Sequence, residues 1–121
     1  MINFEVDEPK RLLVIRYNGA VRGEETEKGL EQIRNGLAKL QRGFRLLADL
    51  TELQSMDVGC APFIEKAMDM CNEKGASMVV RVIPDAHRDI GLQIMSYFHY
   101  SGDVQIVTCQ TLAEAEEILR A

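Results

Sequence analysis

Apolar and polar residues alternate at the start of the chain, over residues 2–7. Alternation with a period of two is typical of a strand that is buried on one face. A second run, residues 11–17, is rich in leucine, valine and isoleucine and follows a short polar turn at Glu8-Pro9. We expect this run to fold back on the first strand as an antiparallel hairpin and to end at Asn18-Gly19.

The spacing of apolar residues changes to three and four over residues 24–41, which predicts a surface helix that ends before Gly43. The near-continuous apolar run over residues 44–50 predicts a strand buried on both faces. The same alternation of patterns continues to the C-terminus. We expect further helices over residues 57–74, 86–100 and from 111 onward, strands over 77–83 and 104–108, and a connector over 51–56.

Two helix ends carry specific signals. Gly75 follows the second predicted helix, where a left-handed residue commonly ends a helix. Thr111 and Glu114 have the spacing of a capping box for the last helix. The apolar face of that helix, which we expect to be buried, consists of Leu112, Ala115, Ile118 and Leu119.

The predicted order of elements places the chain in the α/β class. Strands that alternate with helices of this length form parallel pairs joined by helical crossovers. We therefore expect a mixed, mainly parallel sheet of about five strands with four helices. A chain of 121 residues without a linker or an internal repeat is expected to form one domain over residues 1–121.

Composition narrows the classes of function. The net charge is −5 and no Lys/Arg run is longer than Lys10-Arg11, so nucleic acid is not an expected partner. No stretch approaches the roughly 20 apolar residues of a membrane span, and residues 1–7 do not resemble a signal peptide. We expect a cytoplasmic protein that needs neither membrane nor cofactor. Three cysteines without a Cys-x-x-Cys pair or a histidine at ligand spacing indicate neither a disulfide framework nor a metal site.

The segment after Asp49-Leu50 is the first candidate site, because ligands and partners gather at the carboxyl ends of parallel strands. Asp57 could cap the helix that follows, leaving free N–H groups to receive an anion or an acceptor of a partner. In the simpler interpretation, Asp57 is only a cap and Gly59 only permits close packing. The residues of this candidate partner-binding site are Thr51, Ser55, Asp57, Val58, Gly59 and Cys60.

Cys60 allows a second interpretation, as a reactive thiolate, because a helix N-terminus lowers the pKa of a thiol. A base such as His87 would have to lie beside it. However, Cys60 and Cys71 are eleven residues apart and share one apolar helix stripe, which favours buried thiols. With His87 and His99 as the only histidines, and no phosphate loop or nucleophile elbow, we assign no catalytic residue.

Residues 46–60 resemble the hallmark segment of STAS domains, in which a strand ending in Asp-Leu-Ser/Thr leads to a Met-Asp-Ser-Ser-Gly-Leu type helix start. Asp49-Leu50-Thr51 and Met56-Asp57 carry the match, and the last helix, residues 111–119, agrees with the family pattern. In anti-sigma factor antagonists of this family, a partner kinase phosphorylates the second serine of the helix start. Val58 and Gly59 occupy the two serine positions here.

The resemblance implies a non-catalytic, bacterial regulatory module that docks a kinase-like or multidomain signalling protein through residues 51–61, without the usual phosphoacceptor. An edge strand or helix face also allows a homodimer, with no pattern that selects the surface. The alternative is a sensor of a small anion or lipid-like molecule, bound near the helix start and the surface of Phe63, Met95 and Phe98. A preformed pocket would distinguish a sensor from a docking face.

Overall fold

The computed structural model describes residues 1–84 and 100–120. Five strands, three α-helices and one 3₁₀ turn lie within these ranges, and the helix expected over residues 86–100 falls almost entirely outside them. The elements in chain order are β1 (Ile2–Asp7), β2 (Leu12–Val21), α1 (Gly23–Leu37), β3 (Arg45–Met56), η1 (Val58–Cys60), α2 (Ala61–Lys74), β4 (Met78–Val82), β5 (Gln105–Cys109) and α4 (Leu112–Arg120).

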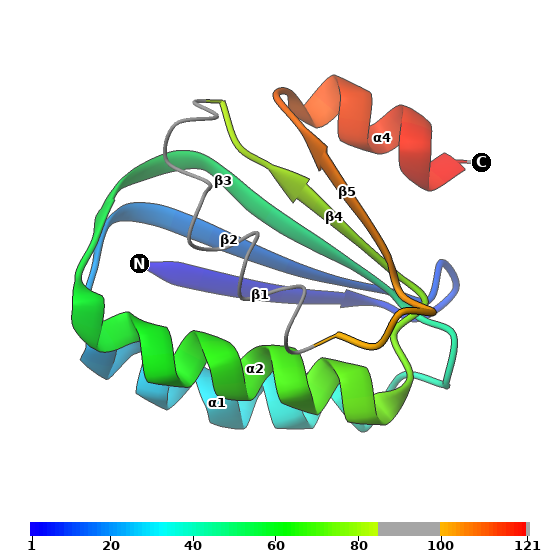
Figure 1. The fold of residues 1–121 in the computed structure, drawn as a ribbon, viewed down its shortest axis with the longest axis horizontal. Coiled ribbons are helices and arrows are strands. Elements are labelled where there is room, and N and C mark those ends of the chain that lie inside the picture. Colours follow the sequence, from blue (N-terminus) through cyan, green and yellow to red (C-terminus); the bar gives the residue numbers. More distant parts are fainter. Residues whose placement is uncertain (85–99, 121) are drawn as a thin grey trace.

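The five strands form one sheet in the order β1-β2-β3-β4-β5 (Figure 1). Strand β1 pairs antiparallel with β2, and every other pair is parallel. The predicted mixed, mainly parallel sheet and its opening hairpin are therefore confirmed. The central place of β3 is confirmed as well, since its first five residues pair on both sides.

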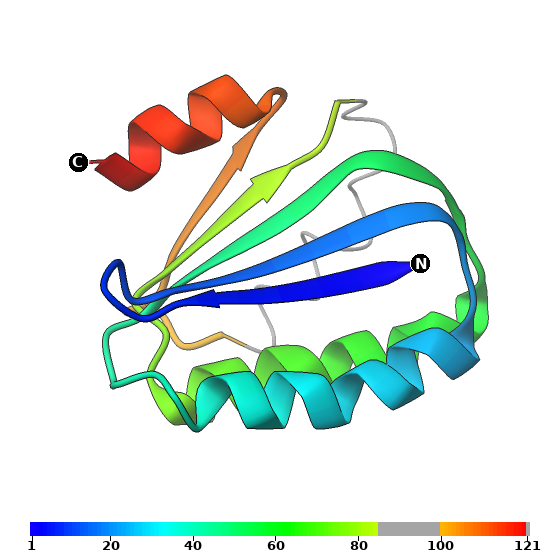
Figure 2. The same ribbon diagram turned by 180° about the vertical axis from the view of Figure 1, so that it is seen from behind.

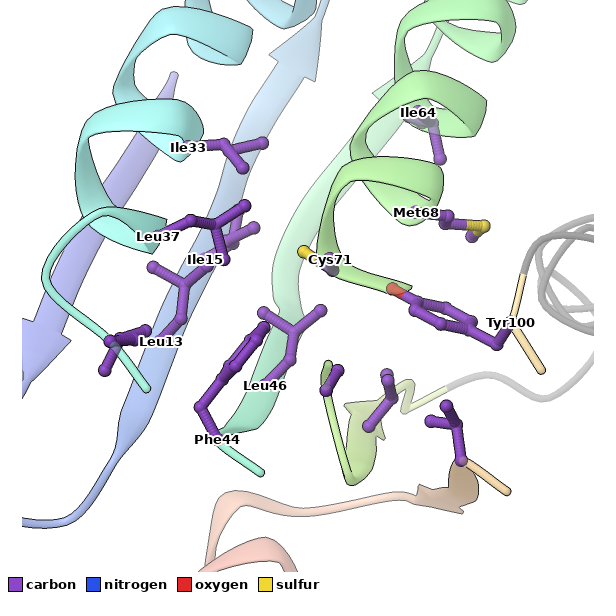
Figure 3. Close-up of a cluster of buried hydrophobic side chains, with 14 of the residues drawn as sticks. Leu13, Ile15, Ile33, Leu37, Phe44, Leu46, Ile64, Met68, Cys71 and Tyr100 are labelled. Atoms are coloured by element: carbon purple, nitrogen blue, oxygen red, sulfur yellow. The ribbon is translucent and has the colours of Figure 1, made fainter. Parts of the chain in front are cut away.

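Helices cover the two faces of the sheet unequally. Of the three described helices, α1 and α2 lie side by side on one face, here called the first face, and α4 lies on the second face (Figures 1 and 2). On the second face α4 packs against β3, β4 and β5. Apolar side chains of alternate strand positions fill both interfaces, and Figure 3 shows the larger core beneath α1 and α2. Its labelled members include Leu13, Ile15, Phe44, Leu46 and Cys71.

Strands β2 and β3 are longer than the sequence pattern predicts. The expected end of β2 at Asn18-Gly19 and the expected connector over residues 51–56 are both wrong. Residues Asn18–Val21 instead pair with Glu52–Met56, with one irregularity in the register just before Asn18 and a second between Gly19 and Ala20. This two-stranded extension, called the ribbon below, curves toward the N-terminal ends of α1 and α2 (Figure 1). Most residues of the ribbon are polar or only half-buried, as in a loop, so the sequence pattern did not predict a strand there.

The helix ends show where local signals are reliable. Gly75 adopts a φ of 99° and ends α2, as predicted. Thr111 caps α4 as predicted, because its hydroxyl accepts the N–H of Glu114 at 3.2 Å, and the same hydroxyl donates to the Glu114 carboxylate at 3.1 Å. Helix α1 ends at Leu37 rather than near residue 41. Leu112, expected to be buried, is 36% exposed, since α4 turns mainly Ala115 toward the sheet.

Gly75 is a point where the fold tolerates no side chain. Its left-handed φ costs a non-glycine residue about 1–2 kcal/mol, and an added Cβ would lie 2.5 Å from Cγ of Arg42. We expect Gly75→Ala to lower the free energy of unfolding by about 2 kcal/mol, measured by chemical denaturation. Gly102→Ala is the control, because no atom lies within 4 Å of its Cβ position. Equal stability of both variants would contradict this account.

Candidate functional site

The first half of the candidate segment builds the sheet. Oδ1 of Asp49 accepts hydrogen bonds from the N–H and the hydroxyl of Thr51, at 3.0 and 2.7 Å. Its Oδ2 lies 3.5 Å from Nε of Arg16 on β2, and the Asp49 side chain is only 5% exposed. These contacts surround the extra residue that β3 inserts between Asp49 and Glu52. The hydroxyl of Thr51 therefore points inward, to a structural carboxylate.

The ribbon carries the chain from this irregularity to the start of α2. Ser55 pairs with Ala20 of β2 and is exposed. Met56 pairs with Val21, whose carbonyl also accepts the N–H of Asp57 at 3.2 Å. Paired strands thus hold the segment where the sequence predicted a loop.

Asp57 does not act as the predicted helix cap. Its side chain makes no capping hydrogen bond, and its carbonyl instead accepts the N–H of Cys60 at 3.1 Å. This bond closes the 3₁₀ turn η1, and α2 begins only at Ala61. Pro62 in the first turn of α2 suits that position, where a missing N–H costs no hydrogen bond.

The turn divides the remaining site residues into exposed and buried ones. Asp57 and Gly59 are exposed, and Val58 is 92% exposed, the highest exposure of any large apolar residue among those described. Cys60 has no exposed surface. The prediction that Cys60 contacts a partner is therefore corrected, because only its neighbours reach solvent.

Gly23, at the first position of α1, is a positioning residue that the sequence analysis missed. A Cβ at this position would lie 2.9 Å from the carbonyl oxygen of Gly59 and 3.0 Å from its carbonyl carbon. The N-terminus of α1 can approach η1 this closely only because Gly23 has no side chain. A glycine at a predicted helix start was the only sequence signal of a close backbone contact. The sequence could not identify the contacting residue, because Gly59 is 36 residues after Gly23.

The environment of Cys60 favours a neutral thiol. Its Sγ lies 3.6 Å from the carbonyl oxygen of Val21 and 3.7 Å from Oδ1 of Asp57. Burial raises the pKa of Cys60, a hydrogen bond with Thr26 acts in the opposite direction, and the charge of Asp57 raises the pKa further. The interpretation as a reactive thiolate loses its physical basis, because a nucleophile needs access and a stabilised anion. His87 and His99 lie outside the described residues.

An apolar cavity lies between the first face and α2, lined in part by Ile15, Leu46, Met68 and Tyr100. Its volume is about 50 Å³. An engineered protein cavity that binds benzene has about 150 Å³. Phe63, which the sensor hypothesis used, is half-buried, whereas Met95 and Phe98 lie outside the described residues.

Within residues 1–84 and 100–120, no three His, Cys, Asp or Glu side chains gather as metal ligands would. All three cysteines are free and buried. No helix in these ranges is long and apolar enough to cross a membrane.

Solved structures place this arrangement in a known fold. The chain is similar to the anti-sigma factor antagonist SpoIIAA in its unphosphorylated form, at 14% identity and a TM-score of 0.71, covering 100% of this chain and 99% of that one. The chain is also similar to an uncharacterized protein of the DUF3478 family with a SpoIIAA-like fold, from Shewanella loihica PV-4. The identity is 17% and the TM-score 0.73, and the match covers 98% of this chain and 92% of that one. An anti-sigma factor antagonist from Mycobacterium paratuberculosis is similar at 19% identity and a TM-score of 0.61, and the match covers 100% of this chain and 96% of that one.

The chain therefore has the STAS-like fold that residues 46–60 led us to expect. At these identities the likeness concerns the fold alone. No protein-family model matches the chain, and no curated protein matches its sequence.

The contact of Gly23 with Gly59 can be tested directly. Gly23→Ala would place a Cβ against backbone atoms that no rotamer change can clear, so we expect a loss of about 2 kcal/mol in unfolding free energy. Amide NMR shifts of Val58 to Cys60 should change with it. Gly102→Ala again provides the control. Unchanged shifts over residues 58–60 would show that the two segments do not touch.

The buried thiols predict a loss of stability in alkali. Burial raises the pKa of Cys71 from 9.0 to about 12, against a smaller opposing effect of Tyr100, whose hydroxyl points toward it (Figure 3). The unfolded thiol ionises from about pH 9, whereas the native one remains neutral. The stabilising difference is therefore complete below pH 9 and is lost as the pH rises toward 12.

We expect Cys71→Ala to reduce the slope of unfolding free energy against pH, measured between pH 8 and 10. A thiol that ionises only in the unfolded chain contributes up to about 1.4 kcal/mol per pH unit above its unfolded pKa. Met68→Leu, in the same core, has no titratable group and should retain the wild-type slope. Identical slopes for the wild type and Cys71→Ala would mean that folding does not raise the pKa of the Cys71 thiol.

Proposed function

We propose that the chain is a non-catalytic, cytoplasmic regulatory module that docks a signalling protein, kinase-like or multidomain, through the surface of η1 and the adjoining ribbon. The observation that carries this proposal is the 92% exposure of Val58. An apolar side chain held outward on a rigid turn has no stabilising role in the free protein, whereas burial of a valine in a partner's pocket would contribute about 1.5–3 kcal/mol.

The surroundings of Val58 indicate the chemistry of the partner. Asp57 precedes it, and Glu24 in the first turn of α1 is also exposed, as is Arg22 just before that helix. Helix α1 is adjacent because Gly23 faces Gly59. A partner that places a basic side chain beside an apolar pocket would complement Asp57 and Glu24. The similarity in fold to anti-sigma factor antagonists supports a protein partner.

The proposed docking is constitutive. Where the resembling family carries its serine pair, this chain carries Val58 and Gly59, neither of which has a hydroxyl. A phosphate at such a helix start would add nearly two negative charges and reorganise a docked interface. The same surface in this chain lacks that acceptor, so we assign control of the interaction to the partner or to protein abundance.

The size of the cavity beside α2 weakens the sensor alternative. The cavity beside α2 is about 50 Å³, too small for a lipid-like molecule without rearrangement. Its lining is apolar apart from Arg81, Tyr17 and Tyr100, and the Arg81 guanidinium donates to the Thr108 hydroxyl at 2.6 Å. At the start of α2 we therefore favour docking over ligand sensing.

The docking proposal predicts that Val58→Asp reduces capture of partner proteins at least tenfold, in a quantitative affinity pull-down from the source organism's lysate. The added charge would have to be buried against the partner's pocket. Leu112→Asp is the matched control, since it introduces the same charge at an exposed apolar residue on α4. Proteins captured equally by both variants and the wild type would place docking elsewhere, and both variants should keep wild-type stability.

A further inference from the structure

A groove lies on the second face, between α4 and the half of the sheet formed by β1 and β2. Its volume is about 680 Å³, within the range of roughly 300–1,000 Å³ typical of small-molecule pockets. It lies at the starts of β2 and β3, whereas the proposed docking surface follows their ends. Its described lining residues are Glu5, Asp7, Lys10, Leu12, Val14, Arg16, Arg45, Leu47, Glu116, Leu119 and Arg120.

The floor of the groove is apolar. Leu12 and Val14 of β2 are register neighbours of Arg45 and Leu47 of β3, so the four side chains share the second face. Leu119 of α4 adds an apolar wall. Helix α4 packs on β3, β4 and β5, which leaves this strip at its margin. Leu12, Val14 and Leu47 are 8%, 5% and 5% exposed, so the apolar surface open to a ligand is a narrow strip, which half-buried Leu119 extends.

One end of the groove carries a preorganised cation. The Arg45 guanidinium donates through Nη1 to the carbonyl of Leu119 and through Nη2 to the carbonyl of Lys10 at 3.0 Å. Both acceptors are main-chain groups, which orient the side chain, and no carboxylate of residues 1–84 or 100–120 forms an ion pair with it. Arg45 is half-buried, where an anionic partner would gain more than in open water.

Two further cations lie beside it. Lys10 and Arg120 are exposed, and no ion pair found among the described residues involves them or Arg45. Lys10 extends from the β1–β2 turn and Arg120 from the end of α4, so the three cations approach the groove from separate elements.

One acidic residue of the groove is paired with a cation. Glu5 accepts a charged hydrogen bond from Arg16 at 3.0 Å, whereas Asp7 accepts only the main-chain N–H of Lys10 at 3.2 Å and keeps its negative charge. Glu116 is exposed on α4. Four basic against three acidic side chains give the lining a positive balance, in a chain whose net charge is −5.

We infer that this groove binds a small amphiphilic organic anion. Its carboxylate or phosphate head would lie among Lys10, Arg45 and Arg120, and its apolar body would lie along Leu12, Val14 and Leu47. The rigid Arg45 supplies directional donors for an oxyanion, and the two flexible cations supply charge. This inference does not depend on the proposed docking function, because it concerns the other end of β2 and β3.

Octyl phosphate is a suitable probe, below its micellar concentration, with octanol and inorganic phosphate as separate arms. Methyl NMR of the full chain should show saturable shifts at Leu12, Val14, Leu47 and Leu119 with octyl phosphate. Octanol and inorganic phosphate should each bind at least tenfold more weakly. Equal binding of octanol would show an apolar site without anion recognition, and equal binding of phosphate would show a bare anion site, so either result overturns the inference.

The variant K10E/R120E should weaken octyl phosphate binding at least tenfold while leaving the fold intact, because both side chains are exposed. K28E/K66E makes the same change in charge on α1 and α2, which cover the first face, and should bind as the wild type does. If both double variants weakened octyl phosphate binding equally, the cause would be the overall charge of the protein and not these two cations. Shifts confined to Ile64 and Met68 would place the probe in the cavity beside α2. Both results contradict the assignment.

Discussion

The parallel pairing of β2 with β3 is the constraint on which the rest of the molecule depends. These are the two longest strands, with ten and twelve residues, and they lie next to each other inside the sheet. Their alternate residues supply both cores: Leu13 and Leu46 face α1 and α2, and Val14 and Leu47 belong to the core of the second face. Their paired ends then continue as the ribbon that positions η1.

The irregularity at Asp49 gives the family-like segment two separate roles. Asp49, Thr51 and Arg16 hold the point where β3 inserts an extra residue and the strands begin to curve. Along the ribbon exposed and half-buried residues are mixed, and the continuously exposed part is Asp57 to Gly59. A resemblance over residues 46–60 therefore reflects mainly the architecture of the strand end. The surface that a partner would contact is short, apolar at Val58 and acidic around it.

Unequal covering of the two faces explains why the groove exists. Helices α1 and α2 together cover the first face, whereas α4 has nine residues and packs on one half of the second. The exposed half is lined by charged side chains of β1 and β2 that screen an apolar floor. Arg45 links the end of α4 to the β1–β2 turn, so the same contact that closes the fold also places a fixed positive charge in the groove.

The sequence by itself determined the type and order of nearly every described element, because the periodicity of apolar residues and the signals at Gly75 and Thr111 act within a few residues. It also pointed to the STAS-like fold. Only the tertiary structure decided the length of β2 and β3, the burial of Cys60, the contact of Gly23 with Gly59 and the setting of Arg45. Each of these depends on pairing between segments far apart in sequence, and local patterns carry no information about register, close backbone approach or desolvation.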